Sequence, residues 1–455
     1  MSRPDVPPII TTTQFIASRG ENPFLCYKNI FYLYGDGVHT PCSGAEIEQT
    51  LVRYLDSNQF YQEIKFPYIN NMKMCLRAQT SIDCRITGFN QWLLEDAKSP
   101  DMHLVCTNGI LKISKDGKVS DTMLPFTSSF FSTIKFPFSY NRRSYARQFM
   151  HFLKQVLPDR DTRLFIQEEL GYLLTHDTKH AKLVILYGTG ANGKSVLLNI
   201  FKLIIGKDNY SSLPFDAFYG DNRFLLIRTE GKTANIYEEI PEDRKIKTAT
   251  IKNLVTGGEF TVEEKFQESR TIKATAKLVF ATNTLPNFSD KSDGIFRRLA
   301  IIPFNKQFLN ANEQNPNLIT DEYWLESGEL EGIFNWAVQG LARLLKRGHF
   351  VEPQCSLEVK KQFRLEQNPG KQFLIDHYQF TGVPRDCVSS FDLYQKYKNY
   401  TLNYGYRPCS SINLGKEVRR TFPQISQSRN PVHRINGIKS RLWFGLKLIS
   451  EQLEQ

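Results

Sequence analysis

The sequence of 455 residues has little that is typical of membrane, secreted or zinc-binding proteins. Its apolar runs, such as residues 183–187, are far shorter than the roughly 20 residues that a bilayer-spanning helix needs. No basic stretch followed by an apolar one marks the start for secretion. The cysteines form no C-x-x-C pair, so we expect scattered, reduced thiols and a cytoplasmic protein. They stand at positions 26, 42, 75, 84, 106, 355, 387 and 409.

Acidic residues are too few to balance the basic ones. The chain has 58 Lys and Arg against 47 Asp and Glu, a net charge of +11. Residues 1–140 carry 13 of each sign, whereas residues 381–455 carry 12 basic and 5 acidic side chains, a net +7 (12 − 5). Because excess cations favour polyanionic partners, the end of the chain is predicted to be the main basic module.

The sequence also lacks internal repeats, which excludes solenoids and propellers. Strands are expected at 182–187, 278–282 and 299–304, and a further short strand is expected to end at 236–237. A helix is expected at 194–205. Strands separated by crossovers imply a parallel sheet, so the fold class is α/β. The predicted domains are a mixed α/β region (1–140), a helical region (141–180), the α/β domain (181–348), a helical linker (349–380) and a winged-helix-like domain (381–455).

A glycine-rich stretch, GTGANGKS, separates the first of these strands from the predicted helix. It consists of Gly188, Thr189, Gly190, Ala191, Asn192, Gly193, Lys194 and Ser195. It matches the phosphate-loop pattern, in which backbone N–H groups surround a phosphate at a helix N-terminus. Lys194 is expected to reach the β- and γ-phosphates, and Ser195 to hold a magnesium ion. The stretch therefore predicts a nucleotide site.

Polar residues follow the other predicted strands. Glu238 and Glu239 come 44 residues after Lys194 (238 − 194), a distance that fits an adjacent or next-nearest strand. One carboxylate can hold magnesium, assigned here to Glu238, and the next can orient and deprotonate water. Asn283 ends the third strand, where it would touch the γ-phosphate or the attacking water. This combination favours nucleotide hydrolysis over small-molecule phosphoryl transfer.

Two arginines, Arg297 and Arg298, precede the strand at 299–304. They are either solvated edge charges or groups that stabilise transition-state charge on a neighbouring subunit. A guanine-reading N-K-x-D motif is absent from the sequence, since Asn305-Lys306 is followed by Gln307-Phe308.

The order of these motifs resembles that of superfamily three helicases, a compact branch of the AAA+ ATPases of viruses, phages and plasmids. The stretches NIYEEI, LVTGGEFTVEEKFQESRTIKATAKLVFATNTLP and DGIFRRLAIIPF are similar to the helicase half of the phage and plasmid primase-helicase family related to the poxvirus uncoating NTPase. The likeness is strongest over residues 183–306.

The resemblance implies ATP and Mg²⁺ as ligands, a homo-hexameric ring and 3′ to 5′ movement on single-stranded DNA in a bacterial host cytoplasm. Asn283 corresponds to the sensor, and Arg297 or Arg298 to the arginine finger. Members often carry a primase, but residues 1–140 show no Asp-x-Asp pair. A primase or polymerase is therefore expected on another chain or in a missing segment.

Two regions are expected to contact DNA. Alternating runs on both sides of residues 267–268 predict a hairpin, which in the family grips the DNA backbone. Its candidate contacts are Lys265, Phe266, Arg270 and Lys273. A helix at 413–422, preceded by a helix that Ser390 caps, presents Lys416, Arg419 and Arg420, and a hairpin turning at Asn436-Gly437 follows.

The sequence therefore predicts an ATP-dependent DNA helicase that replicates a phage, plasmid or other mobile element. The alternative is an origin-binding initiator ATPase that unwinds little. A small-molecule P-loop enzyme is disfavoured by the polar residues at the three strand ends.

Overall fold

A computed structural model describes residues 6–82, 88–93, 101–218, 222–240, 245–246, 248–263, 269–288, 293–310, 315–428, 433–435 and 438–449. The chain divides into a larger unit, residues 1–286 with 298–356, and a smaller one, residues 287–297 with 357–455. The finer division into five domains stays a prediction. Among the helices that the structure describes, none has both the length and the apolar character needed to cross a membrane.

A five-stranded parallel sheet lies at the centre of the larger unit. Its strands, in spatial order, are β16 (Leu299–Pro303), β8 (Leu183–Tyr187), β14 (Lys277–Thr282), β10 (Ala234–Glu238) and β9 (Tyr210–Ser211). Every residue of β14 and β16 is buried, as expected for parallel strands that are covered on both faces. The four predicted strands are confirmed, whereas β9 was not foreseen.

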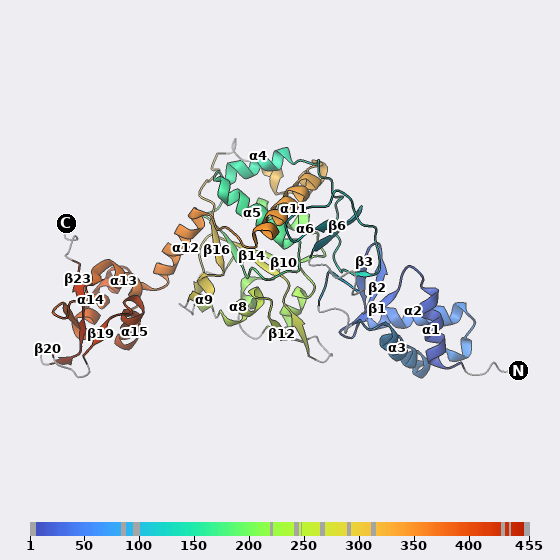
Figure 1. Cartoon of the computed structure of the whole chain (residues 1–455), viewed down its shortest axis with the longest axis horizontal. Coiled ribbons are helices and arrows are strands. Elements are labelled where there is room, and N and C mark those ends of the chain that lie inside the picture. Colours follow the sequence, from blue (N-terminus) through green and yellow to red (C-terminus); the bar gives the residue numbers. More distant parts are fainter. Residues whose placement is uncertain are drawn as a thin grey trace. The chain divides into compact units, whose positions relative to one another are not determined.

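Helices cover this sheet and share one large hydrophobic core with it. They include α4 (Arg147–Val156), α5 (Arg160–Leu173), α6 (Lys194–Ile205) and α11 (Leu330–Arg347), and Figure 1 shows α4, α5 and α11 beside one another. The backbones of α5 and α11 approach so closely that a side chain at Gly171 or Gly340 would overlap the facing helix. Glu168 of α5 then pairs with Arg343 and Arg347 of α11.

The N-terminal region is mixed α/β, as the sequence predicts. Its elements are α1 (Pro8–Ser18), β1 (Phe24–Tyr27), β2 (Ile30–Gly35), β3 (Val38–Cys42), α2 (Gly44–Ser57), η1 (Tyr61–Glu63), α3 (Phe66–Thr80), β4 (Gln91–Trp92), β5 (Met102–Cys106), β6 (Gly109–Ile113) and β7 (Phe130–Phe131). Strands β1, β2 and β3 form an antiparallel sheet, and Phe15, Leu51 and Met72 of the three helices pack against it.

Further short elements lie between the sheet strands of the larger unit or between β16 and α11. They are η3 (Phe215–Phe218), α7 (Arg223–Leu226), η4 (Ile227–Thr229), β11 (Lys245–Ile246), α8 (Ala249–Val255), β12 (Glu259–Val262), β13 (Arg270–Lys273), η6 (Pro316–Ile319) and α10 (Asp321–Glu326). Strands β12 and β13 pair antiparallel, which confirms the predicted hairpin. Its central residues, 264–268, lie outside the described residues.

The smaller unit has its own core, built around Phe373, Tyr397 and Trp443. The elements of the unit and the helix that leads into it are β15 (Asn287–Phe288), α9 (Asp293–Phe296), α12 (Gln354–Glu366), α13 (Pro369–His377), β17 (Tyr378–Phe380), β18 (Cys387–Ser389), α14 (Ser390–Asn403), α15 (Ser411–Thr421), β19 (Ser426–Gln427), β20 (His433–Ile435), β21 (Ile438–Ser440), β22 (Leu442–Phe444) and β23 (Leu446–Leu448).

Two sequence predictions for this unit need correction. Ser389, not Ser390, caps α14, because the Ser389 hydroxyl accepts from the N–H groups of the first helical turn. The hairpin predicted to turn at Asn436-Gly437 has paired strands, β20 and β21, but its second half, an alternating run at 438–449, is three short strands rather than one. Gly445, with φ of 77°, separates the last two. Helices followed by short strands agree with a winged helix, which stays a prediction.

Candidate functional site

The candidate site lies at the carboxyl edge of the central sheet. Strand β14 stands between β8 and β10, and Thr282 pairs with Tyr187 while Glu238 pairs with Ala281. The three strands therefore end close together, which brings the phosphate loop, Asn283 and the glutamate pair to one edge. The carboxylates stand on the next-nearest strand to β8, one of the two positions that the sequence spacing allowed.

The phosphate loop has a backbone that other residues would not adopt easily. Gly190 and Gly193 have φ of 95° and 86°, and Ala191 is also left-handed at 48°. A Cβ atom on Gly193 would stand 2.6 Å from Cγ1 of Val156 in α4. A Cβ atom on Gly188 would overlap the side-chain amide of Asn192. The glycines are thus required both by the turn and by close packing around it.

Lys194 is the most deeply placed charged group of the site, with 6% of its surface exposed. Its Nζ donates to three neutral oxygens: the carbonyl of Gly188 at 2.6 Å, Oδ1 of Asn192 at 3.0 Å and Oδ1 of Asn283 at 3.2 Å. Burial lowers the pKa of Lys194, while the charge of Glu238 acts in the opposite direction. An ammonium buried among neutral acceptors attracts an anion strongly, so this donor set fits a phosphate.

The two glutamates differ in setting. Glu238 ends β10, and its Oε1 lies 3.9 Å from Nζ of Lys202. Glu239 is exposed and has φ of 76°, while its N–H donates to the carbonyl of Ala281 at 2.9 Å. A left-handed glutamate is uncommon, and such backbone outliers concentrate at functional sites. Ser195 is half-buried in the first turn of α6, so its hydroxyl and the Glu238 carboxylate offer the oxygens that Mg²⁺ prefers.

The segment after β16 braces the phosphate loop, which sequence reasoning missed. The amide of Asn192 donates to the carbonyl of Phe304 at 3.2 Å, and the amide of Gln307 to Oγ1 of Thr189 at 2.7 Å. The N–H of Phe308 donates to the carbonyl of Ala191 at 2.8 Å. No motif marks these residues, because their role comes from β16 lying next to β8.

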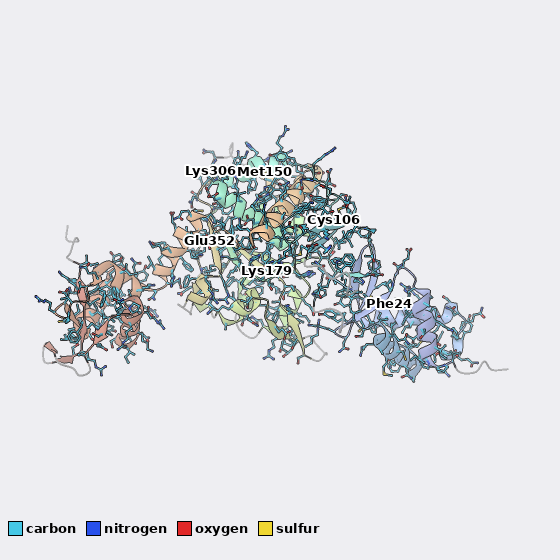
Figure 2. All side chains as sticks on the ribbon, viewed as in Figure 1. Phe24, Cys106, Met150, Lys179, Lys306 and Glu352 are labelled. Carbon is cyan, nitrogen blue, oxygen red and sulfur yellow. The ribbon has the colours of Figure 1, made fainter. Side chains whose placement is uncertain are left out.

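A cavity of 340 Å³ lies beside the loop and also escaped sequence reasoning. It is lined by Val156, Leu157, Pro158, Asp159, Thr162, Pro303, Asn305, Lys306 and Cys355. Figure 2 labels Lys306, which lies beyond the carboxyl end of β16. Val156 lies next to Gly193, so one wall of the cavity is close to the start of α6. Most of its accessible lining is apolar, which suits a flat heterocycle.

The two arginines, Arg297 and Arg298, do not join the phosphate loop, Asn283 and the glutamates at the carboxyl edge of the sheet. Arg298 is half-buried, and its carbonyl accepts from the N–H of Leu183 at 2.9 Å. This places Arg298 at the amino edge, one strand length, about 16 Å, from the phosphate loop. Arg297 is exposed and belongs to the smaller unit. Neither position tests whether one of them acts on a neighbouring subunit.

The predicted DNA contacts fall into three groups. Lys265 and Phe266 lie outside the described residues. Lys273 is exposed on β13, whereas Arg270 is ion-paired with Glu230.

The third group, Lys416, Arg419 and Arg420, is exposed along α15. Arg420 pairs with Glu417 at 2.5 Å. Arg419 donates to Oε1 of Gln427 at 2.8 Å and lies over the ring of Trp443.

Comparison with known proteins gives a consistent picture. A model described as "Family of unknown function (DUF5906)" matches residues 186–298. "Putative helicase L207/L206" of Acanthamoeba polyphaga mimivirus is 24% identical over 295 residues, 61% of this chain and 31% of that protein. "Putative helicase 184R" of Invertebrate iridescent virus 6 is 27% identical over 226 residues, 47% and 21% of the two chains. "Putative primase C962R" of African swine fever virus is 26% identical over 157 residues, 33% and 16%.

Among solved structures, the NrS-1 C-terminal region matches with a TM-score of 0.52 and 12% identity, covering 97% of this chain and 100% of that one. At this identity the likeness concerns the fold alone. The chain spans about a third or less of the length of the curated relatives it matches. The chain is therefore related to viral proteins named as helicases and primases.

Proposed function

We propose that the chain is the ATP-hydrolysing motor of a replicative DNA helicase that moves 3′ to 5′ on single-stranded DNA. The observation that supports this most is the shared edge of β8, β14 and β10. There Lys194 contacts Asn283, and β10, which ends at Glu238 and is followed by Glu239, lies directly beside the strand that precedes Asn283. An amide between a phosphate-binding lysine and two carboxylates suits hydrolysis of a terminal phosphate.

In this proposal the residues of the loop bind MgATP. Lys194 exchanges its neutral oxygen partners for the β- and γ-phosphates, and the backbone N–H groups between Gly188 and Ser195 surround them. Ser195 and Glu238 would hold a magnesium ion, which would neutralise phosphate charge. The apolar cavity beside Gly193 receives the base.

Hydrolysis then requires a positioned water. Glu239 is exposed, and its N–H donates to Ala281 in β14, the strand that precedes Asn283. Glu239 is proposed to orient and deprotonate this water. Asn283 is proposed to hold the water or the γ-phosphate. Arg297 or Arg298 is proposed to reach the site of a neighbouring subunit in a homo-hexamer, because Arg298 lies a strand length from its own loop.

The proposed DNA contacts are the hairpin tip, with Lys265 and Phe266, the exposed Lys273, and the cations of α15. Lys416, Arg419 and Arg420 present exposed charges that suit phosphate contacts. The relatives support a role in replicating a virus, phage, plasmid or similar element, with a primase or polymerase as a partner.

Strand displacement on a forked duplex tests the proposal. The native chain with MgATP should separate the strands, whereas Lys194→Ala should not. Lys154→Ala, which removes an exposed lysine of α4, is the matched control and should behave like the native chain. ATP hydrolysis stimulated by single-stranded DNA without any displacement would contradict a helicase.

The exposed cations of α15 favour a second candidate, an origin-binding initiator ATPase. It shares the nucleotide site but uses the smaller unit to bind a duplex sequence. Tight, sequence-specific duplex binding together with failed displacement would favour this alternative.

A further inference from the structure

The hairpin of β12 and β13 is held by two ion pairs at the ends nearest its central residues. NH1 of Arg223 lies 3.1 Å from Oε1 of Glu263, directly after β12. Arg270, the first residue of β13, pairs with Glu230. Both partners come from one short stretch, residues 223–230, which contains α7 and η4.

The Glu230–Arg270 pair has the stronger geometry of the two. NH1 of Arg270 lies 2.6 Å from Oε1 of Glu230, and NH2 lies 2.6 Å from Oε2, so two parallel bonds join the groups. The side chains of Arg270 and Glu230 are 31% and 22% exposed, against 46% and 34% for Arg223 and Glu263. Less exposure means less screening by solvent and salt.

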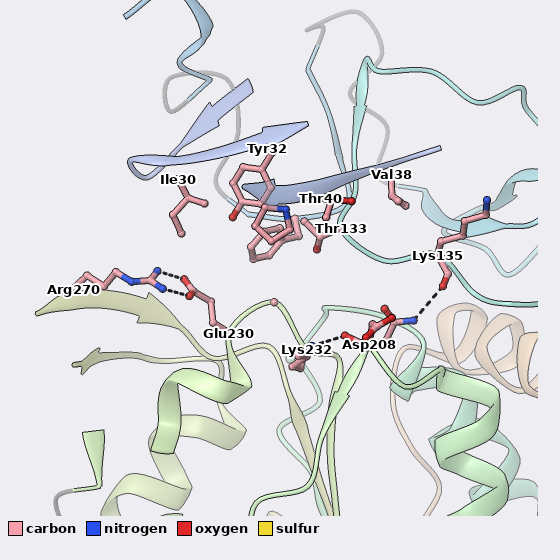
Figure 3. Close-up of a pocket in the computed structure, with 14 residues that line it drawn as sticks. Ile30, Tyr32, Val38, Thr40, Thr133, Lys135, Asp208, Glu230, Lys232 and Arg270 are labelled. Carbon is pink, nitrogen blue, oxygen red and sulfur yellow. Dashed lines mark hydrogen bonds and ion pairs between the residues drawn. The ribbon is translucent and has the colours of Figure 1, made fainter. Parts of the chain in front are cut away.

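The pair forms part of the lining of a 510 Å³ cleft beneath the N-terminal sheet. Figure 3 shows Ile30 and Tyr32 of the N-terminal sheet facing the pair, with Lys232 and Asp208 on the same wall as Glu230. Burial raises the pKa of Tyr32, and the nearby charge of Glu230 raises it further. The N-terminal sheet therefore faces the pair across the cleft, and the pair stays partly exposed.

The stretch that holds the hairpin leads straight into β10. Beyond Glu230, the carbonyl of Lys232 accepts from the Thr275 hydroxyl at 2.8 Å, and that of Thr233 from the N–H of Lys277 at 2.9 Å. Strand β10 begins at Ala234 and ends at Glu238. Strand β10 is paired on both sides, so it forms a continuous stretch of backbone between the segment that follows Glu230 and the glutamates.

An isolated two-stranded hairpin is marginally stable in water, so its position depends on such external contacts. We propose that Glu230 is a positioning residue that fixes the hairpin, through Arg270, to the strand that carries Glu238 and Glu239. Arg270 is then a brace and not itself a phosphate contact. This inference rests on the proposed function for its effect on hydrolysis, but the bracing itself is independent of any activity.

Removing each charge of the pair, and then exchanging the two charges, tests the brace in the full chain. Glu230→Gln and Arg270→Gln should each lower the stimulation of ATP hydrolysis by single-stranded DNA about fivefold or more, as for a typical coupling energy. Hydrolysis without DNA should stay within about twofold. The double variant Glu230→Arg with Arg270→Glu restores the opposite charges and should recover the stimulation. Glu259→Gln, an exposed carboxylate on the same hairpin, should have no effect.

Two results would overturn the proposal. Unchanged stimulation in both single variants would show that the pair carries no coupling. A double variant as weak as Arg270→Gln would show that Arg270 itself is needed, as expected for a direct contact with nucleic acid.

Amide hydrogen exchange separates this inference from the proposed function. In Glu230→Gln, amides of residues 259–262 and 270–273 should exchange about tenfold faster than in Glu259→Gln, and the double variant should restore protection. If the native chain hydrolyses no ATP, the proposed function fails but this comparison still applies. Equal exchange rates in Glu230→Gln and Glu259→Gln would overturn the brace.

Discussion

The two edges of the central sheet each bury a lysine, and only one of them resembles a ligand site. Lys194 at the carboxyl edge is 6% exposed, and Lys277 at the amino edge is 4% exposed. Figure 2 labels Lys306, just after β16, and Lys179, just before β8, which belong to the carboxyl and amino edges respectively. Burial lowers the pKa of both buried lysines, for Lys277 to about 7.

The amino edge is sealed. Lys277 donates to the carbonyl of Thr175 and lies 5.1 Å from the centre of the Tyr172 ring. Glu169 is fully buried nearby, and burial raises its pKa to about 7. His176 completes this group, with Nε2 3.0 Å from the carbonyl of Gly231. The charges of Lys277 and Glu169 influence each other within the protein interior.

The carboxyl edge is open by contrast. Its lysine donates to three neutral oxygens, two of them side-chain amides, its glutamates are accessible, and left-handed residues line its loop. A buried lysine therefore does not mark a site by itself. What distinguishes the candidate site is that its desolvated cation stands at a left-handed phosphate loop beside accessible carboxylates.

The largest expected effect concerns the open edge. Glu239→Gln keeps the size of the side chain but removes the base, so ATP hydrolysis should fall about 10² to 10⁴-fold. Nucleotide affinity should change less than about threefold, because Glu239 is not proposed to hold phosphate. Steady-state kinetics and equilibrium binding check both. Glu322→Gln, an exposed carboxylate of α10, is the control, and equal rates for the two variants would exclude Glu239 as the base.

The next effect concerns stability at the sealed edge. Burial lowers the pKa of His176 from 6.5 to about 4, so the folded chain holds the ring neutral. At this residue the unfolded chain then binds protons first as the pH falls from 6.5 to 4, so His176 should contribute a loss of about 3 kcal/mol in the stability of the native state. Glu169, whose pKa is raised to about 7, contributes in the opposite direction, so the His176 contribution is read from the difference between the native chain and His176→Phe. The free energy of unfolding of His176→Phe, measured in urea, should fall less over this pH range than that of the native chain. An equal change in the free energy of unfolding in the two proteins would show that His176 does not cause this pH dependence.

The smallest expected effect is the alkaline counterpart. The pKa of Lys277 is lowered from 10.5 to about 7 in the folded chain, so stability should rise as the pH increases from 7 towards 10.5. Between pH 7 and 9 the gain is about 2 kcal/mol. Lys277→Met has no such charge, and its stability should lack this increase in unfolding experiments. A gain of the same size in Lys277→Met would assign it to another group.

The sequence predicts the open edge far better than the sealed one. Gly188, Lys194 and Glu238 stand in a spaced pattern beside strands with continuous apolar runs, and such patterns report backbone turns and strand ends. Glu169, His176 and Lys277 follow no pattern, because they meet only when α5, its following loop and β14 pack together.

The same limit applies around the candidate site. The contacts of Phe304 and Gln307 with the loop depend on β16 lying beside β8, an order of strands that crossover spacing does not specify. Likewise, Arg270 was identified as a cation on a hairpin, but its bond to Glu230 depends on the folding of residues 223–230 against that hairpin.

Equilibrium binding of MgATP to the native chain, Lys194→Ala and Lys277→Met tests the central claim most directly. The native chain and Lys277→Met should bind with dissociation constants within about threefold of each other. Lys194→Ala should bind at least about tenfold more weakly, a loss of about 1.4 kcal/mol or more. Equal binding by all three proteins, or an equal loss in Lys277→Met, would contradict the assignment of nucleotide binding to the open edge.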